Sequence, residues 1–259
     1  MKIELVLGSG AARGIAHVGV LRELEARGHE VVRLHGTSMG ALVGGAYACG
    51  TLDRFEEIAR STGLRRALWH LDAAFDGSGV VAGRRVRRLL RVLYGDRRIE
   101  ELPLPFSATT VDLTGWEEVV LTEGPLAAAV HASIAIPGLF APVRSRRRVL
   151  VDGSLTTPLP IPTERDPAAD LLLSVSALGA PEEAARLGRR PPRFMPGILT
   201  TTFDILLHSV ERAAIANRPE GVHIDLPANI TNNMAFHRSG DVIDAGRRVA
   251  AAALDREGL

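Results

Sequence analysis

Residues 36–40 read Gly-Thr-Ser-Met-Gly, so a single serine, Ser38, stands between two glycines. The pentapeptide follows the apolar run 30–35 and precedes the apolar run 41–49, a pattern that predicts a strand, a sharp turn and a helix. In that setting a strained turn would hold the serine hydroxyl out as a nucleophile, beside the positive end of a helix. A tight turn without chemistry is the alternative interpretation, and the rest of the chain has to decide between them.

A nucleophilic serine needs a base, and the chain offers two kinds. Asp152 follows the apolar residues 149–151 and precedes Gly153, which places it at the carboxyl end of a predicted strand, where open α/β sheets carry their sites. An aspartate that only starts a turn is the alternative for Asp152. The other candidates are His208, His223 and His237, since many serine hydrolases carry a histidine late in the chain. None of the three has a distinctive local sequence, so a surface or core role is the simpler interpretation.

A glycine-rich segment, GSGAARG at 8–14, also ends a predicted strand and opens a helix. Its backbone N–H groups could surround an anion. Arg13 stands where a dinucleotide-binding fingerprint needs its third glycine, and the segment lacks the lysine of a phosphate-binding loop. The segment therefore favours an oxyanion loop beside Ser38 over a nucleotide site.

Alternating elements must position these residues. Apolar runs predict strands at 2–7, 30–35, 105–112, 116–122, 148–151, 170–176 and 222–226. Helical spacing predicts helices at 15–26, 41–49, 53–61, 84–94, 125–134, 200–216 and 240–255. Strands that alternate with helices indicate an α/β fold of three layers, with a mainly parallel central sheet covered by helices on both faces. We expect one domain over residues 1–259, with a loop at 179–199 that could be mobile or act as a lid.

The composition of the chain argues against several other classes of protein. The 259 residues are 46% hydrophobic and 24% charged, which suits a globular protein, and the formal charge of 31 − 30 = +1 gives no global field for nucleic acid. The single cysteine, Cys49, excludes an intramolecular disulfide framework and a multi-cysteine metal site. The uncharged stretches 34–52 and 124–143 are interrupted by glycine or proline, so we interpret them as buried core. No signal peptide is apparent, and we expect a cytoplasmic protein that could touch membranes peripherally.

The three motifs together resemble the patatin-like phospholipase family, above all its small, single-domain bacterial members. That family has a glycine-rich loop, a GxSxG turn and a later Asp-Gly pair, which stand here as GSGAARG, GTSMG and DGS (152–154). The segments GIAHVGVLRELEARG after the loop and ASIAIPGLFAPV at 132–143 match as well. The resemblance covers roughly residues 3–177.

The resemblance implies a serine–aspartate dyad that works without histidine, cofactor or metal. Ser38 would attack an ester carbonyl and Asp152 would accept its proton. Backbone amides around Gly10 and Ala11 would hold the oxyanion, and Arg13 would shape that loop. Structural roles in the motifs would fall to Gly8, Gly14, Gly36, Gly40 and Gly153.

The expected substrates are acyl esters of lipids, such as phospholipids, lysophospholipids or glycerides. A protein that binds lipids or acyl groups without hydrolysing them, on the same fold, is the alternative. Some residues depart from the family pattern: Ser9 and Ala11 replace glycines of the loop, Ser154 replaces a glycine or alanine, and His35 stands where a small residue is usual. The loop at 179–199 carries Phe194 and Met195 among arginines, which suits either an interfacial lid or a surface loop.

Overall fold

An eight-stranded, mostly parallel sheet forms the centre of the protein. The computed structural model describes residues 1–61, 84–145, 147–179, 194–218, 220–227, 229–231 and 235–259. Its strands are β1 (Lys2–Leu7), β2 (Glu30–Thr37), β3 (Phe106–Asp112), β4 (Glu117–Leu121), β5 (Val143–Ser145), β6 (Arg148–Asp152), β7 (Leu171–Gly179) and β8 (Val222–Pro227). They lie in the order β5-β6-β3-β2-β1-β7-β8, with β4 paired to β3. The five strands from β3 to β8 along this order are parallel, while β4, β5 and β6 run antiparallel to their neighbours.

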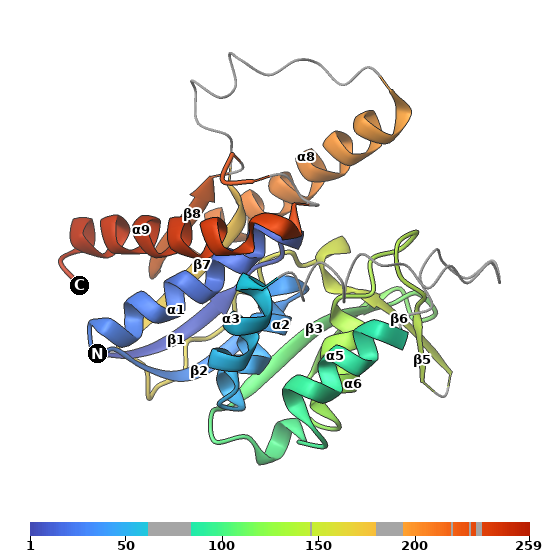
Figure 1. Cartoon of the computed structure of the whole chain (residues 1–259), viewed down its shortest axis with the longest axis horizontal. Helices are drawn as coiled ribbons and strands as arrows, with labels where there is room; N and C mark the ends of the chain where they lie inside the picture. The colour runs from blue at the N-terminus through green and yellow to red at the C-terminus, as the bar shows by residue number, and fades with distance from the viewer. Residues whose placement is uncertain (62–83, 146, 180–193, 219, 228, 232–234) are drawn as a thin grey trace.

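Helices follow the strands as the sequence predicts. They are α1 (Ala16–Ala26), α2 (Met39–Ala48), α3 (Leu52–Arg60), α5 (Arg84–Tyr94), α6 (Leu126–Ser133), α8 (Met195–Ala216) and α9 (Ser239–Glu257). Short 3₁₀ turns occur at η1 (Ala11–Ile15), η2 (Ile99–Glu101), η3 (Gly153–Leu155) and η4 (Phe236–Arg238). In Figure 1, α1 and α9 lie side by side across one face of the sheet, and α8 extends away from it. The predicted α/β fold with a mainly parallel sheet is therefore confirmed.

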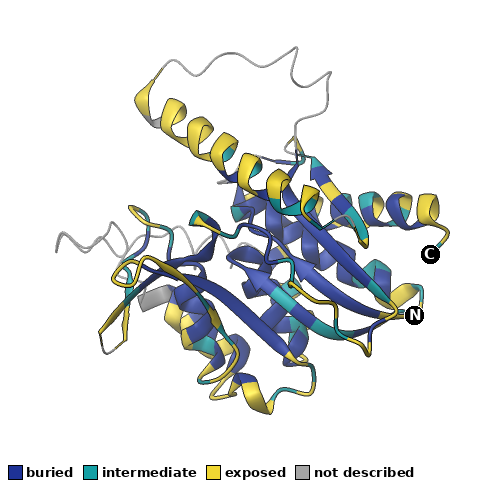
Figure 2. Ribbon diagram, turned by 180° about the vertical axis from the view of Figure 1, so that it is seen from behind, coloured by how far each residue is buried: buried dark blue, intermediate teal, exposed yellow. Residues whose placement is uncertain are grey.

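The two faces of the sheet are covered unequally. In β1, Ile3, Leu5 and Leu7 belong to the large core under the helices. Val6 points the other way, because neighbouring side chains of a strand alternate between faces. There it packs in a small cluster with Leu159 and Leu172, next to Ile161 and Ile215. The far layer thus combines an extended segment after β6 with the end of α8, and the strands are largely buried (Figure 2).

Two details differ from the sequence prediction. The predicted loop at 179–199 is shorter, because Gly179 ends β7 and Met195 already begins α8. The segment is rich in proline, arginine and glycine, which indicates a loop, but proline is favoured in the first turn of a helix, and Pro196 lies in the first turn of α8. Residues 180–193 of that loop lie outside the described residues. The other detail is β5, a three-residue edge strand that is too short to show a period in the sequence.

Candidate active site

Ser38 lies at the turn between β2 and α2. Its backbone has φ 55 and ψ −119, a conformation that non-glycine residues rarely adopt and that stores strain. Its N–H donates a 2.9 Å hydrogen bond to Oγ of Ser133, whose hydroxyl in turn donates to the carbonyl of Thr109 at 2.7 Å. Ser133, at the end of α6, therefore holds the strained turn in place. No local pattern around Ser133 indicates this role.

The glycines around Ser38 allow the backbone to pack closely. A Cβ atom on Gly40 would lie 2.0 Å from the carbonyl oxygen of Leu7 in β1, and one on Gly36 would lie 2.6 Å from Cα of Ala41. Real side chains cannot occupy such positions. The start of α2 can therefore rest directly on the end of β1, which fixes the direction in which Ser38 projects.

Asp152 meets Ser38 at the end of β6. Oγ of Ser38 donates a 2.6 Å hydrogen bond to Oδ2 of Asp152, and the backbone N–H of Ser154 donates to Oδ1 at 2.8 Å. The N–H of Asp152 donates to the carbonyl of Ala135 at 3.0 Å. Ser38 is 5% exposed and Asp152 1% exposed. Both carboxylate oxygens are thus occupied, and one of them is directed at the serine hydroxyl.

One edge of β3 brings the two residues together, although they lie 114 positions apart in the chain. β2 pairs with residues 106–109 of β3 and β6 with residues 110–112. β4 pairs with residues 108–112, which overlaps both, so β2 and β6 must share the opposite edge. Thr37 is opposite Thr109, and Asp152 is opposite Thr110. The carboxyl ends of β2 and β6 therefore meet at neighbouring residues of β3, which places Asp152 beside Ser38.

Burial makes Asp152 a stronger base than an exposed aspartate. Loss of water raises the pKa of its carboxyl to about 6, although the hydrogen bonds from Ser38 and Ser154 act in the opposite direction. At neutral pH the group is still mostly ionised, and it can accept a proton from the serine hydroxyl. A serine paired with a buried carboxylate is suited to nucleophilic attack on an ester.

The glycine-rich loop lies beside this pair. Gly10 precedes η1 and Ala11 is its first residue, so their N–H groups have no partner within that turn. Ala11 has φ 47, a left-handed conformation that favours the glycine usual in such loops. Backbone hydrogen bonds hold the start of this loop. The N–H of Gly8 donates to the carbonyl of Val175 at 2.9 Å, and the N–H of Ser9 donates to the carbonyl of Pro158 at 2.8 Å.

The buried side chain of His17 forms a hydrogen bond to the backbone of the same loop. Its Nε2 donates to the carbonyl of Gly8 at 2.8 Å. Burial lowers the pKa of His17 to about 4, against a smaller opposing effect of that hydrogen bond, so the ring is neutral at physiological pH. His17 lies in the segment GIAHVGVLRELEARG that matches the family, but the sequence alone indicates no role for it.

Arg13 points away from the loop and toward α8. Its side chain is almost fully buried, and Nη2 lies 3.5 Å from Oδ1 of Asp204. Arg13 therefore joins the glycine-rich loop to the helix on the other side of the site. This partner lies 191 positions away in the chain, and no local pattern pointed to it.

A cavity of about 290 Å³ connects these groups. Ser38, Asp152, Gly10, Ala11 and Arg13 all line it, together with Ser154. Gly8, Gly14, Gly36, Gly40 and Gly153 are buried in the backbone around it. Most of the remaining wall is apolar and consists of Ile136, Leu139, Leu155, Leu178, Phe203 and Leu207. The cavity thus places the hydroxyl of Ser38, the carboxylate of Asp152 and the backbone of the glycine-rich loop next to an apolar surface that suits a hydrocarbon chain.

The histidines considered as alternative bases lie elsewhere. Nδ1 of His208 bonds the carbonyl of Leu178 at 2.9 Å, and His237 is exposed. His223 lies between Ser174 and Asp225, at 2.9 Å and 3.0 Å. None of the three lines the cavity. His35 bonds Oγ of Ser107 and Oε1 of Glu4, so it belongs to a polar network of the sheet.

One group of side chains could hold a metal ion. Among the residues that the structure describes, Glu211, His223 and Asp225 bring one ligand atom each within 4.8 Å of one another. His223 and Asp225 already bond each other, and Arg212 lies 3.9 Å from Asp225. None of these residues lines the cavity of Ser38.

Comparisons with known proteins show the family of this chain. Residues 5–163 match the sequence model of a family described as patatin-like phospholipase. An uncharacterized NTE family protein of Mycobacterium tuberculosis strain H37Rv is 30% identical over 98% of this chain and 91% of its own length. Lysophospholipase NTE1 of Mycosarcoma maydis is 34% identical over 62% of this chain, which corresponds to 9% of that larger protein.

Two solved structures share the fold. VipD from Legionella pneumophila superposes with a TM-score of 0.64 at 14% identity, over 98% of this chain and 66% of VipD. The type III effector ExoU superposes with a TM-score of 0.50 at 17% identity, over 99% of this chain and 53% of ExoU. The chain thus spans two thirds or less of each. At these identities the likeness concerns the arrangement of the sheet and helices alone.

Proposed function

Since the chain belongs to the patatin-like phospholipase family, we propose that it is a serine hydrolase of lipid acyl esters that uses Ser38 and Asp152 as its catalytic pair. The observation that carries the proposal is the 2.6 Å hydrogen bond from Oγ of Ser38 to Oδ2 of Asp152, at the bottom of a largely apolar cavity. A serine that only formed a turn would need neither the buried carboxylate nor the cavity.

The reaction proceeds in two halves. Oγ of Ser38 attacks the ester carbonyl carbon while its proton passes to Asp152. The N–H groups of Gly10 and Ala11 face the negative charge that develops on the carbonyl oxygen. The intermediate collapses, the C–O bond to the alcohol breaks, and Asp152 returns the proton to the departing alcohol. Water then attacks the acyl-serine ester while its proton passes to Asp152. The bond between the acyl carbon and Oγ breaks, Asp152 returns the proton to Oγ of Ser38, and the fatty acid leaves.

The apolar wall favours a hydrocarbon acyl group as the substrate. Phe203 and Leu207 bring α8 into that wall. The same helix carries large apolar side chains in contact with solvent: Met195, Ile198, Leu199, Ile205, Leu206 and Val210. Figure 2 shows α8 exposed along most of its length. None of the helices in the described part of the chain is long and apolar enough to cross a membrane.

We therefore assign α8 as the surface that touches a lipid layer, from which an acyl chain would enter the cavity beside Phe203. Leu206 is 57% exposed, and Val120 on β4 is 48% exposed. Leu206→Ser should weaken sedimentation with phosphatidylcholine vesicles several-fold, whereas Val120→Ser should not. Equal binding by both variants would exclude α8 as the lipid contact, and a change of oligomeric state in Leu206→Ser would indicate that α8 packs against a second copy instead.

Labelling of the serine tests the catalytic proposal. A long-chain fluorophosphonate should add once to the wild-type protein, as seen by intact mass, and not to Ser38→Ala. Ser209→Ala is a matched control, because Ser209 is exposed on α8 and does not line the cavity. Asp152→Asn should stay folded and lose labelling and esterase activity. If the folded wild type took no label but bound fatty acids, the protein would be a lipid-binding member of the family rather than a hydrolase.

A further inference from the structure

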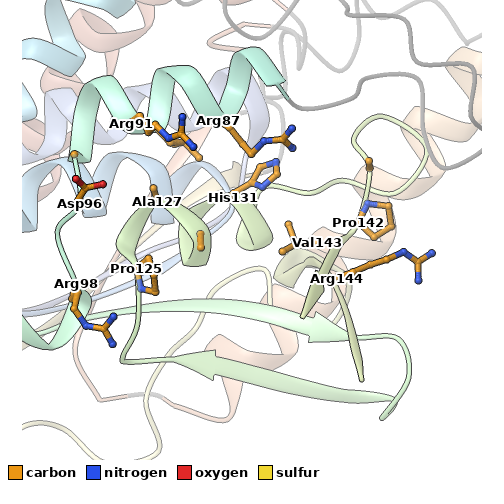
Figure 3. Close-up of a pocket in the computed structure, with 14 residues that line it drawn as sticks. Arg87, Arg91, Asp96, Arg98, Pro125, Ala127, His131, Pro142, Val143 and Arg144 are labelled. Atoms are coloured by element: carbon orange, nitrogen blue, oxygen red, sulfur yellow. The ribbon is translucent and has the colours of Figure 1, made fainter. Parts of the chain in front are cut away.

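A second, larger cavity lies apart from the proposed catalytic pair. It has a volume of about 610 Å³ and lies between α5, α6 and β5 (Figure 3). It shares no lining residue with the cavity of Ser38. Volumes of this order suit a small-molecule ligand, for which protein sites span about 300–1,000 Å³.

The walls of this cavity are strongly cationic. Arg87 and Arg91 belong to α5, Arg98 directly precedes η2, and Arg144 belongs to β5. Asp96 is the one carboxylate among the described residues that line it. Two of the arginines, Arg91 and Arg144, form no ion pair with any residue in the described part of the chain. The cavity therefore has an excess of positive charge that the described chain does not neutralise.

His131 supplies an independent observation. The side chain comes from α6, is only 8% exposed and lines the cavity. Its Nε2 is buried and has no hydrogen-bond partner among the residues that the structure describes. Figure 3 shows the ring extending from α6 toward Arg87 on α5. A buried ring nitrogen without a partner is costly, and an acceptor atom of a ligand would satisfy it.

The floor of the cavity also favours negative charge. Pro125, Ala127 and Ala128 belong to the start of α6, where the helix presents its positive end. Their small side chains leave space for a ligand. In Figure 3, Arg87 and Arg91 lie on α5 beside this space, while the side chains of Arg98 and Arg144 extend away from His131. A guanidinium suits the acceptor oxygens of a phosphate group, because it can donate two parallel hydrogen bonds.

We propose that the cavity between α5, α6 and β5 binds a phosphate-bearing anion, with Arg91 and His131 as ligands. The volume exceeds what a bare phosphate fills, so the ligand carries an organic group. The phosphate could belong to a lipid head group at a membrane surface or to a soluble phosphate ester. The proposal does not depend on hydrolysis at Ser38, since it concerns separate residues.

Binding measurements on the Ser38→Ala protein separate the two sources. One arm uses glycerol 3-phosphate in solution, followed by calorimetry. The other uses phosphatidylcholine vesicles with and without phosphatidylglycerol, followed by co-sedimentation. Binding in the first arm assigns the site to soluble phosphate esters as well as head groups, whereas binding only to the vesicles that contain phosphatidylglycerol assigns it to anionic head groups.

Variants tie that binding to the cavity. Arg91→Gln should raise the dissociation constant about tenfold, which corresponds to about 1.4 kcal/mol. Arg88→Gln is the matched control, because Arg88 is an exposed arginine of the same helix that does not line the cavity. His131→Leu should weaken binding as well. If Arg88→Gln weakened binding as much as Arg91→Gln, or if neither ligand bound at low salt, the site would be disproved.

Discussion

The charge on Asp152 should cost the protein stability, and Asp152→Asn measures that cost. The carboxyl is buried, and burial raises its pKa from 3.8 to about 6. In the unfolded chain the group ionises at its ordinary pKa. Between these two values the folded state binds more protons than the unfolded state, so the free energy of unfolding falls as the pH rises.

The size of the effect follows from the shift. About two pKa units at about 1.4 kcal/mol each amount to about 3 kcal/mol once the pH is above 6. Between about pH 4.5 and pH 7.5 the free energy of unfolding should fall by about 2 kcal/mol, because the remaining part of the loss occurs below pH 4.5. An asparagine can keep both hydrogen bonds: its oxygen accepts from the N–H of Ser154, and its amide donates to Oγ of Ser38. The substitution therefore removes the charge with little else.

Urea unfolding of both proteins, followed by circular dichroism, tests this expectation. The stability of Asp152→Asn relative to wild type should rise by about 2 kcal/mol from about pH 4.5 to pH 7.5, while activity is lost. Asp112→Asn is a control of opposite sign. Burial raises the pKa of Asp112, but hydrogen bonds from the N–H groups of Thr114 and Val149 outweigh burial and hold the pKa below its ordinary value of 3.8. This variant should therefore lose stability relative to wild type as the pH rises toward 3.8 and show little further change between about pH 4.5 and pH 7.5. A pH-independent difference for Asp152→Asn would refute the argument that burial strengthens this base.

Further expectations concern the same site. The kcat/KM for a soluble ester should rise about tenfold per pH unit up to about pH 6 and then level off, since Asp152 must be ionised; a break near pH 4 would mean an aspartate that remains hydrated. Gly40→Ala should lower the free energy of unfolding by about 3 kcal/mol or prevent folding, because its Cβ would lie 2.0 Å from the carbonyl of Leu7; thermal unfolding shows this, and an unchanged midpoint contradicts it. Ala11→Gly should keep activity and raise the free energy of unfolding by about 0.5–1 kcal/mol, because Ala11 has φ 47, which glycine adopts without strain. A lower midpoint of thermal unfolding would argue against strain at Ala11.

The sequence predicted the local elements of the site because their signals are local. The strand before Ser38, the turn GTSMG and the following helix all lie within 20 residues of the sequence. The strand before Asp152 is likewise followed directly by DGS. The alternation of strands and helices sufficed for the mainly parallel sheet. The family resemblance then brought Ser38 and Asp152 together as a predicted pair, which the 2.6 Å hydrogen bond supports.

Contacts between distant parts of the chain could not be predicted in this way. Ser133 lies in an alanine-rich helix, and nothing nearby indicates that its hydroxyl accepts from the N–H of Ser38. The direction of the Arg13 side chain toward Asp204 depends on where α8 lies in the fold. No pattern near Arg13 in the sequence indicates that position. The cationic cavity assembles from α5, α6 and β5, whose arginines separately look like solvated surface positions.

The shared edge of β3 has a consequence for how the protein becomes active during synthesis. Ser38, the glycine-rich loop and β3 are all translated before β6, which must add to the free part of that edge to deliver Asp152. A nascent chain that ends before residue 148 therefore lacks the carboxylate that lies beside Ser38 in the complete sheet. We expect reactivity toward esters to emerge late, as the sheet is extended, so that a ribosome-bound chain cannot attack lipids before its own fold is assembled.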